Sequence, residues 1–349
     1  MESWVENARM IVDSAAAIVP ADGAIARVRA QRFQLPGFSR AVFAEMGAMG
    51  WLQLVLPEDQ GGAGLGMREC TALVSALGRG LIPEPIIDAL FAQRLLAGRA
   101  APEIMDGRHV AVAGWQDRTD SLDFAGLSSA SGRLSGVKRH VAGGAGADVF
   151  AVLGAEGVAI VPADADGLQI ETAALQDGTF EATLTFRDVA AEWLPVDDAD
   201  KALDEAVLSQ SAYLLGLAER GIDMTLDYLR IRRQFGRPIG SFQALQHRAT
   251  ALKIELELCR ATVQRTAARI DAGAPPSVRA AAVSRTKARA ASLAFLMARE
   301  AVQMHGAIGI TEEADIGLIV SGAIAAANRF GSARLHRGRH FSASERSAA

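Results

Sequence analysis

Apolar side chains recur every three or four residues through most of residues 1–108. Phe43, Met46 and Met49 form one such stripe, and Cys70 begins a second. Because an α-helix completes a turn in about 3.6 residues, side chains at this spacing share one face of a helix. We therefore expect an N-terminal helical domain over residues 1–108.

Residues 109–198 follow a different pattern, in which short apolar or alternating runs are separated by turns rich in Gly, Asp and Ala. The clearest runs are 110–112, 149–153, 158–161 and 182–186. Runs of this length, bounded by turn residues, are typical of β-strands. We expect a middle domain that is a small β-barrel or β-sandwich.

Long helical patterns fill residues 199–349. They are rich in Ala, Leu and Arg, and they span 203–228, 242–272, 277–304 and 316–327. Pro275 and Pro276 separate two of them, because proline cannot continue the helix before it. The pattern predicts a C-terminal four-helix bundle. The expected fold class is therefore α+β, with a helical domain, a β-barrel domain and a helix bundle in that order.

The composition is that of a folded chain without a polyanion partner. Half of the 349 residues are apolar, which is enough for two or three domains. A formal net charge of -4 gives no basic surface for nucleic acid. The N-terminal segment is acidic, and no apolar run reaches the roughly 20 residues that a membrane helix needs. We expect no nucleic-acid partner, no membrane association and no secretion.

Neither the cysteines nor the histidines predict a metal site. Cys70 and Cys259 lie far apart without a CxxC or Cys/His spacing, so they support neither a disulfide scaffold nor zinc and favour a reducing cytoplasm. His336 and His340 have the i, i+4 spacing that suits a metal on a helix. However, Gly338 lies between them and no glutamate follows as in HExxH. We expect a solvated basic tail and no metal.

A glycine-rich loop over residues 57–66 has two interpretations. A phosphate cradle is poorly supported, because the GxGxxG spacing is not met and no strand precedes the loop. A loop that caps the following helix is favoured. The chain also has no nucleophile elbow, so hydrolysis by a Ser/His/Asp triad is not predicted.

A charged turn between two helical patterns is the strongest candidate site. It reads Arg-Arg-Gln-Phe-Gly-Arg-Pro-Ile-Gly over residues 232–240, and about sixty residues later the chain reads Gln-Met-His-Gly-Ala over residues 303–307. A dinucleotide needs cations and amide donors for its pyrophosphate, and a close backbone approach where only glycine leaves room. The residues that supply these groups are Arg232, Gln243, Gln303 and Gly306.

These two segments resemble the flavin-binding C-terminal half of the acyl-CoA dehydrogenase family. Residues 46–78 resemble the N-terminal helical domain of that family, and residues 132–150 resemble its G-x-x-x-G-x-K-x-x-I-T-N-G hairpin. The resemblance covers nearly the whole chain. It implies FAD as cofactor, an acyl-CoA substrate, α,β-dehydrogenation of the thioester, and a hetero- or homo-tetramer.

The resemblance also implies which residues contact FAD. In the family, the matching positions reach an FAD that is held mainly by a neighbouring subunit. The implied contacts are Arg232, Gln234, Phe235, Gln243, Gln303, Met304, His305, Gly306 and Ala307. Taken singly, Arg232 is also explained as a solvated turn residue, Gln303 as a helix-surface amide, and His305 as a packed residue.

The other half of the flavin site departs from the family pattern. Family members carry a T-E-P-x-x-G-S-D loop, which residues 112–121 lack, and Val141 and Ala142 stand where the family has the I-T pair. By resemblance, those positions meet the flavin ring and the thioester. We therefore expect this chain's own flavin pocket to be degraded or empty.

The catalytic glutamate of the family is also missing. Its usual E-G-T motif is replaced by the tripeptide that begins at Phe330, and its alternative position on the first bundle helix is Ala206. Glu205 is adjacent, but one residue rotates a side chain by about 100° around a helix. Glu205 is therefore only a weak candidate base, and a solvated helix face is the favoured explanation for it.

Three hypotheses follow. The leading one is a non-catalytic subunit that works with a related catalytic acyl-CoA dehydrogenase subunit and completes the partner's FAD site in trans. By resemblance, such heteromers act on CoA thioesters with bulky acyl groups, including sterol side chains. The second is a homotetrameric acyl-CoA dehydrogenase whose base is Glu205 or an unrecognised carboxylate. The third is a flavin-free structural or regulatory subunit.

Overall fold

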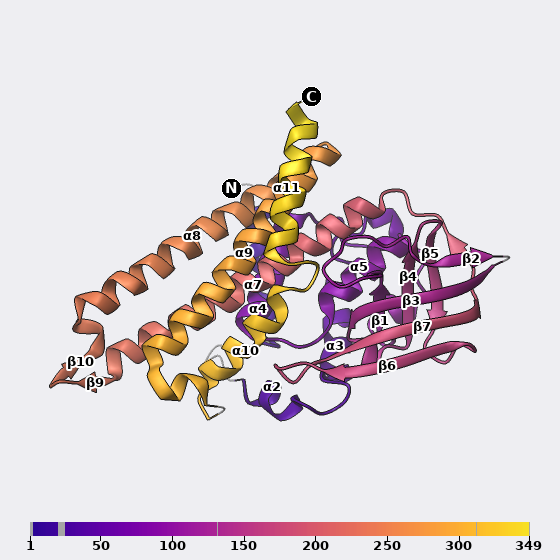
Figure 1. Cartoon of the computed structure of the whole chain (residues 1–349). Helices are drawn as coiled ribbons and strands as arrows, with labels where there is room; N and C mark the ends of the chain where they lie inside the picture. The colour runs from indigo at the N-terminus through magenta and orange to yellow at the C-terminus, as the bar shows by residue number, and fades with distance from the viewer. Residues whose placement is uncertain (1–2, 20–24, 131, 312, 349) are drawn as a thin grey trace. The chain divides into compact units, whose positions relative to one another are not determined.

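The structure, a computed structural model, describes residues 3–19, 25–130, 132–311 and 313–348. The chain forms two compact units, and its segments alternate between them (Figure 1). One unit comprises Met1–Arg29, Thr71–Ile82 and Val207–Ala349, and the other comprises Ala30–Cys70 and Pro83–Ala206. The domain boundaries expected from the sequence, 1–108, 109–198 and 199–349, stay a prediction.

Helices occupy much of the first 108 residues, as the periodicity predicts. They are α1 (Ser3–Ala15), α2 (Ala26–Gln31), α3 (Arg40–Ala48), α4 (Met67–Arg79), α5 (Ile86–Leu96) and α6 (Pro102–Met105), with 3-10 helices at Trp51–Gln53 and Glu58–Gln60. The glycine-rich loop caps α4, because the Gly66 backbone N–H donates to Oε2 of Glu69 at 3.2 Å. The capping interpretation of this loop is therefore confirmed.

Two four-stranded sheets form the middle of the chain. The first has the order β1-β4-β5-β8, with β1 (Ala111–Gly114) parallel to β4 (Val149–Gly154) and with β5 (Gly157–Pro162) and β8 (Trp193–Leu194) antiparallel. The second is antiparallel, with the order β2 (Ser128–Ala130), β3 (Arg133–Ala142), β7 (Phe180–Ala190) and β6 (Leu168–Ala174).

The two sheets pack against each other and do not close into one barrel within the described strands. A Cβ at Gly114 of β1 would lie 3.2 Å from Cδ1 of Leu184 on β7. On its other side, β4 is covered by α5. This double cover explains why the residues of β4 are apolar throughout and almost entirely buried. Of the two forms expected, the middle region is therefore the sandwich.

The four predicted bundle helices are present. They are α7 (Ala199–Ile231), α8 (Gln243–Asp271), α9 (Pro276–His305) and α10 (Asp315–Ala327). Both α8 and α10 pack on α9, whose inward positions include the fully buried Ala290, Ala291 and Ala294. These small side chains allow neighbouring helices to approach closely.

A fifth helix, α11 (Ala333–Ala348), packs along α9 and corrects the expectation of a solvated basic tail. The side chains of His336 and Ala343 are fully buried. The arginines of this segment interrupt its apolar pattern in the sequence; Arg334, Arg337 and Arg346 are exposed, whereas Arg339 is half-buried. Sequence periodicity alone therefore missed α11.

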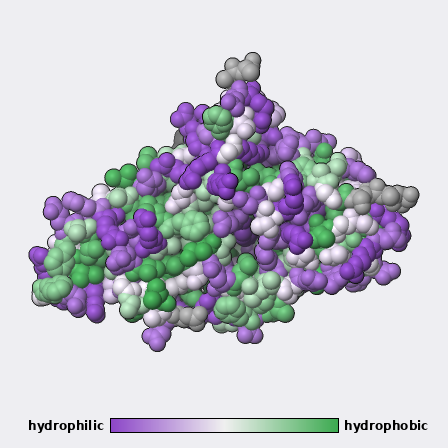
Figure 2. Space-filling model, viewed as in Figure 1, coloured by the Kyte–Doolittle hydropathy of each residue, from purple (hydrophilic) through white to green (hydrophobic). Residues whose placement is uncertain are grey.

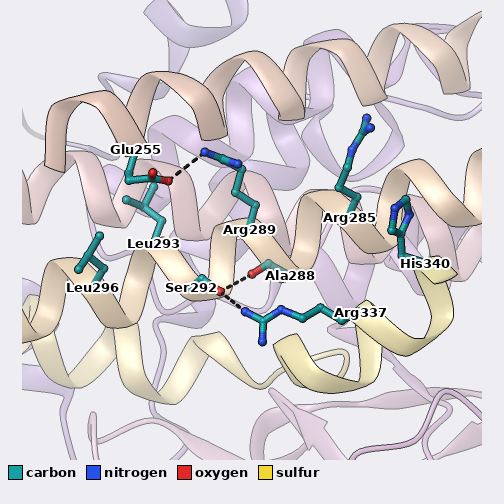
Figure 3. A pocket seen from close by; sticks show the side chains of 9 residues that line it. All are labelled: Glu255, Arg285, Ala288, Arg289, Ser292, Leu293, Leu296, Arg337 and His340. Carbon is teal, nitrogen blue, oxygen red and sulfur yellow. Dashed lines mark hydrogen bonds and ion pairs between the residues drawn. The ribbon is translucent and has the colours of Figure 1, made fainter. Parts of the chain in front are cut away.

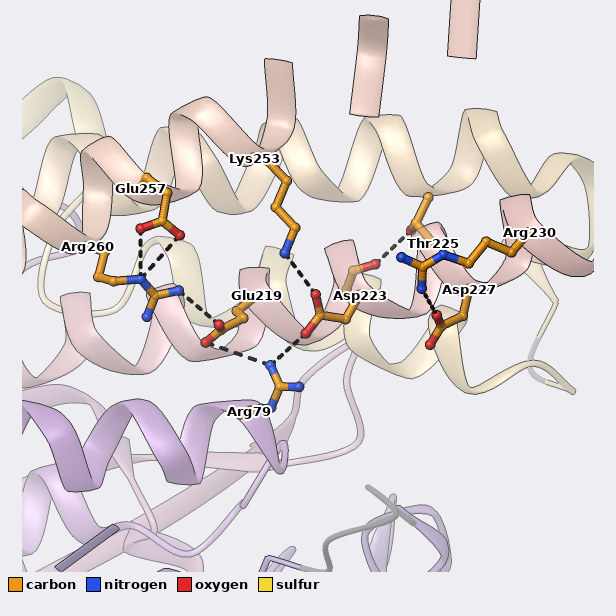
Figure 4. Close-up of polar contacts among 10 residues, drawn as sticks. Arg79, Glu219, Asp223, Thr225, Asp227, Arg230, Lys253, Glu257 and Arg260 are labelled. Atoms are coloured by element: carbon orange, nitrogen blue, oxygen red, sulfur yellow. Dashed lines mark hydrogen bonds and ion pairs between the residues drawn. The ribbon is translucent and has the colours of Figure 1, made fainter. Parts of the chain in front are cut away.

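Ion pairs fasten α4 and α8 to α7 (Figure 4). Asp223 of α7 accepts from Nη1 of Arg79 at 2.8 Å and from Nζ of Lys253 at 2.9 Å. Arg260 of α8 donates to Glu219 of α7 at 2.8 Å. Burial raises the pKa of Asp223, but the hydrogen bonds from Lys253 and Arg79 outweigh it and hold the pKa below its usual value.

Apolar side chains gather on the bundle surface in the view of Figure 2. The large exposed apolar residues of the bundle helices include Ile254 and Leu258 on α8, Phe295 on α9 and Ile324 on α10. None of the helices in the described parts of the chain is both long and apolar enough to cross a bilayer.

Candidate functional site

The charged turn between α7 and α8 is a two-residue β-hairpin. In it, β9 (Arg233–Gln234) pairs with β10 (Arg237–Pro238), and the intervening Phe235 and Gly236 have φ angles of 53° and 81°. Two successive positive φ angles are those of a type I′ turn, which matches the twist of paired strands. The Phe235 side chain is 90% exposed and meets the Phe242 ring edge-on, with 6.0 Å between centroids. The hairpin therefore displays its side chains.

The groups predicted to hold a pyrophosphate are exposed at this end of the bundle. Arg232, Gln243 and Gln303 are exposed, and within the described chain their side chains make no hydrogen bond or ion pair. Gly306, which follows α9, has a φ of 69° and open space around the place of a side chain. A dinucleotide pyrophosphate binds to cations and amide donors that have no other hydrogen-bond partner, and it approaches the backbone closely where no side chain intervenes. These residues therefore fit that end of the cofactor.

An aromatic stack brings the two predicted segments to the same end of the bundle. The His305 ring at the end of α9 stacks on Tyr228 near the end of α7, with centroids 4.4 Å apart and planes 22° apart. Its Nδ1 donates to the Ala301 carbonyl at 2.9 Å. Burial lowers the pKa of His305, against the opposing effect of that hydrogen bond. Figure 1 shows the hairpin and the end of α9 at the same end of the bundle.

The structure divides the predicted cofactor contacts into two groups. Met304 and His305 are buried, so their side chains pack within the chain. The other predicted contacts are exposed; they are Arg232, Gln234, Phe235, Gln243, Gln303, Gly306 and Ala307.

The position of the expected carboxylate after α10 is occupied by a buried ring. Phe330 is 4% exposed, and its carbonyl accepts from Nε2 of His336 at 2.7 Å. Nζ of Lys287 donates to the carbonyls of Ala327 at 2.7 Å and Gly331 at 2.8 Å. Lys287 and His336 are both fully buried, so their hydrogen bonds fix the backbone of this loop from within. The loop therefore presents no acid at this position.

The alternative position for a base, on α7, is also without an acid. Ala206 is 4% exposed. The neighbouring Glu205 is 7% exposed, and its carboxylate accepts from Nε of Arg94 at 2.6 Å and from Nη2 at 3.3 Å. The expectation that Glu205 lies on a solvated face is therefore wrong. The reason is Arg94, which lies far away in the sequence and neutralises the carboxylate inside the protein.

The segment that lacks the expected flavin motif is folded around a buried lysine. Lys138 of β3 is fully buried, and its Nζ donates to the carbonyls of Trp115 at 3.0 Å and Phe124 at 2.8 Å and to Oδ1 of Asp117 at 2.5 Å. Oδ2 of Asp117 in turn accepts from the Gly126 N–H at 2.7 Å. Burial lowers the pKa of Lys138, and Asp117 opposes that effect. The three donors of the ammonium group are therefore used inside the loop.

A histidine ties the same loop to the second sheet. His140 lies at an irregularity in the pairing of β3 with β7 and has a φ of 55°. Its Nδ1 is 3.0 Å from Oε1 of Glu181, and its Nε2 is 2.8 Å from Oγ1 of Thr119. The hydrogen bond to Glu181 raises the pKa of His140, although burial opposes the shift.

We predict a shallow pH dependence of stability from this histidine. Because the folded pKa is raised, its contribution is complete below the unfolded pKa of about 6.5 and is lost as pH rises through the folded pKa. About a third of the His140 side chain is exposed, so solvent screening limits the effect to less than about 1 kcal/mol. Urea unfolding at several pH values should show the slope in the wild type and not in His140→Gln. Equal slopes would contradict the assignment.

Sequence reasoning missed the internal partners of these positions. Lys138 and Lys287 each stand beside arginines and other polar residues in the sequence, so no local signal indicates that these lysines are buried. The acceptors of Lys287 and the partner of Glu205 lie on distant segments, at Ala327, Gly331 and Arg94. Local patterns carry no information about such pairs.

Two family models match the chain. One is described as acyl-CoA dehydrogenase, N-terminal domain, over residues 5–97, and the other as acyl-CoA dehydrogenase, C-terminal domain, over residues 196–338. Acyl-CoA dehydrogenase IpdE2 of Mycobacterium tuberculosis is 30% identical over 317 residues, which cover 90% of this chain and 89% of that relative.

Solved structures share the fold over nearly the full length. A variant of the steroid ACAD Tcur3481-Tcur3483 superposes with a TM-score of 0.89 and 26% identity, covering 99% of this chain and 100% of that one. The ChsE4-ChsE5 complex from Mycobacterium tuberculosis contains a chain that superposes with a TM-score of 0.84 and 24% identity, covering 100% and 98%. The latter likeness concerns the fold alone.

Proposed function

The chain belongs to the acyl-CoA dehydrogenase family of oxidoreductases, and from this premise we propose that it is the non-catalytic subunit of a heteromeric acyl-CoA dehydrogenase. In this role it completes the FAD site of a related catalytic subunit in trans. The reaction of the complex is α,β-dehydrogenation of an acyl-CoA thioester. FAD, when bound, accepts a hydride from the substrate while a carboxylate removes the α-proton.

One contrast carries the proposal. The groups suited to the pyrophosphate end of FAD, such as Arg232 and Gln303, are exposed, and their side chains make no hydrogen bond or ion pair with the described residues. The two positions suited to the base hold the buried Phe330 and Ala206 instead. A chain that keeps one half of an FAD site and lacks the catalytic glutamate is suited to complete the active site of another subunit.

Each retained group has a distinct task in this proposal. Arg232 donates charge-assisted hydrogen bonds to the pyrophosphate, and Gln243 and Gln303 add neutral amide donors. Gly306 lets the backbone come close because no side chain intervenes. The partner supplies the flavin-ring loop and the carboxylate.

Heteromeric relatives support the choice of partner and substrate class. The ChsE4-ChsE5 structure is a complex, and the Tcur3481-Tcur3483 protein is described as a steroid ACAD. We extend this to an acyl-CoA with a bulky acyl group, such as a degraded sterol side chain. Cys70 and Cys259 are buried, and neither forms a disulfide within the described chain, which suits the cytoplasmic location that we propose.

The exposed apolar residues of the bundle support an oligomer. Ile254, Leu258 and Phe295 are 55%, 47% and 41% exposed. Clusters of large apolar side chains on a bundle surface are stabilised when a second subunit covers them. A hetero- or homo-tetramer is the assembly that we propose.

The two rival functions have less support. A homotetramer that uses Glu205 as its base requires a carboxylate that can reach the substrate, whereas this carboxylate is buried and paired with Arg94. A flavin-free structural subunit has no use for the exposed, uncommitted Arg232 at the end of the bundle. Both rivals are distinguished from the proposal by the experiments below.

Glu205→Gln is expected to leave the activity of the complex within roughly threefold of wild type, because the carboxylate binds Arg94 and not the substrate. It should lower the free energy of unfolding by about 1–3 kcal/mol, because Arg94 loses its charged partner. Glu257→Gln, at the more exposed ion pair with Arg260, is the control and should change stability by less than about 0.5 kcal/mol. An activity loss on the order of a thousandfold would instead make Glu205 the general base.

Isolation of the tagged chain from its native cells tests the proposed function. We expect a second acyl-CoA dehydrogenase subunit to co-purify in equal amount, and we expect it to carry the glutamate and the T-E-P-x-x-G-S-D loop. The complex should reduce an electron acceptor in the presence of acyl-CoA, and the isolated chain should not. Activity of the homogeneous chain alone would overturn the assignment.

A further inference from the structure

A second cationic site lies in the bundle, between α8, α9 and α11 (Figure 3). It is a pocket of about 340 Å³ whose polar lining consists of Glu255, Arg285, Arg289, Ser292, Arg337 and His340. Its charged lining comprises three arginines and one glutamate; in Figure 3 the Arg289 side chain points to Glu255 and the Arg337 side chain points to Ser292. The pocket therefore carries an excess of positive charge inside a chain whose net charge is -4.

The positive charge is only partly neutralised. Nη2 of Arg289 donates to Oε2 of Glu255 at 2.9 Å, whereas Nε of Arg289 is buried and has no hydrogen-bond partner among the residues that the structure describes. Within the described part of the chain, Arg337 donates to a neutral group alone, the Ser292 hydroxyl, at 3.0 Å. Arg285 is exposed and makes no hydrogen bond or ion pair with the described residues.

Neighbouring charges add to this excess. Burial lowers the pKa of Arg285, and repulsion by Arg269 and Arg265 lowers it further. A cation that is held beside two others, without an acid of its own, is stabilised when an anion enters. Arginine suits an oxyanion because its planar fork of donors matches the geometry of a phosphate group.

We propose that this pocket binds a multiply charged phosphate anion of the diphosphate type, with Arg285, Arg289 and Arg337 as the binding residues. A diphosphate offers several acceptor oxygens and enough charge for all three guanidinium groups. Leu293 and Leu296 complete the lining with apolar side chains. The source of the diphosphate is either the free inorganic ion or a nucleotide.

This site is separate from the proposed FAD contacts. Arg285 lies near the beginning of α9, whereas Gln303 and Gly306 lie at its end. At about 1.5 Å of rise per residue, they are on the order of 30 Å apart along the helix. Loss of the anion site therefore leaves the cofactor contacts in place, and the two proposals fail independently.

The test is calorimetric titration of the full-length chain with inorganic pyrophosphate and with ADP at low ionic strength. We expect saturable binding of pyrophosphate with a Kd below about 1 mM, weakened by added salt. Arg285→Gln should weaken binding by about tenfold or more. Arg299→Gln, an equal loss of charge on α9 outside the pocket, should change it by less than about twofold.

A third variant separates a binding site from general loss of structure. Glu255→Gln removes the one competing carboxylate, so it should tighten pyrophosphate binding by about threefold or more. A damaged fold would not produce this gain. Equal affinity for pyrophosphate and ADP supports a site for the diphosphate alone, and tighter ADP binding supports a nucleotide site. The proposal is overturned if the wild type shows no saturable binding, or if Arg285→Gln and Arg299→Gln weaken binding equally.

Discussion

Purified alone from cells that supply FAD, the chain is expected to retain less than about one flavin per ten polypeptides. Arg232 and the amides of Gln243 and Gln303 together offer roughly 2.5–6 kcal/mol of net hydrogen bonding. Association itself costs roughly 4–15 kcal/mol, so these contacts alone leave little or no net affinity. The ring-binding half does not add to them, because residues 112–121 lack the family motif.

The measurement is the visible flavin spectrum after gel filtration, with the chain concentration determined independently. Protein co-purified with its catalytic partner serves as the positive control and should be yellow. A stoichiometric flavin spectrum in the isolated chain would contradict the degraded-pocket interpretation. It would favour the homotetrameric rival.

Arg232→Ala, made in this chain and assembled with the partner, is expected to weaken FAD binding by the complex by about tenfold to a hundredfold. The guanidinium group is exposed at the start of the hairpin and uncommitted in the described chain. Its charge-assisted hydrogen bonds to the pyrophosphate are worth about 1.5–3 kcal/mol. Flavin release on dilution, followed by fluorescence, measures the change.

Arg230→Ala is the matched control. Arg230 is exposed, lies two positions before Arg232, and pairs with Asp227 on its own helix at 2.6 Å. The substitution removes the same charge from the same end of α7, but Arg230 matches no position of the cofactor motif. Its effect on FAD binding should stay within about threefold. Equal losses in both variants would show that Arg232 acts through long-range charge and not through contact.

The long helices were predictable because each repeats one signal many times. α7, α8 and α9 keep an apolar stripe over some eight turns, so a few irregular positions do not obscure them. α11 was missed because its arginines, histidines and serines interrupt the few apolar residues of the segment, although His336 and Ala343 are fully buried. Its burial depends on the surface of α9, which no local pattern contains.

The strands were predictable one by one, but their pairing was not. β1 pairs with β4, although β2 and β3 lie between them in the chain. Whether such strands form a barrel or a sandwich depends on which edges meet, and that depends on contacts distant in sequence. The glycine at 114 fits the sandwich, because any side chain there would crowd Leu184.

The candidate site was predictable where its residues lie in short motifs. The hairpin at 232–240 and the end of α9 were found in this way, and the structure brings them to one end of the bundle. The burial of Glu205 and its ion pair were not predictable, because its partner Arg94 lies 111 residues away in the sequence. The sequence motifs thus indicate that the family glutamate is missing. Only the tertiary contacts show that Glu205 does not replace it, because it is paired with Arg94.

The most direct test of the central claim is an FAD titration of the catalytic partner, first alone and then with this chain at equal assembly. We predict that the apo-partner alone binds FAD at least tenfold more weakly than the complex does, because it lacks the pyrophosphate contacts supplied from this chain. The Arg232→Ala complex should fall between the two. If the partner alone binds FAD as tightly as the wild-type complex, this chain does not complete the site in trans.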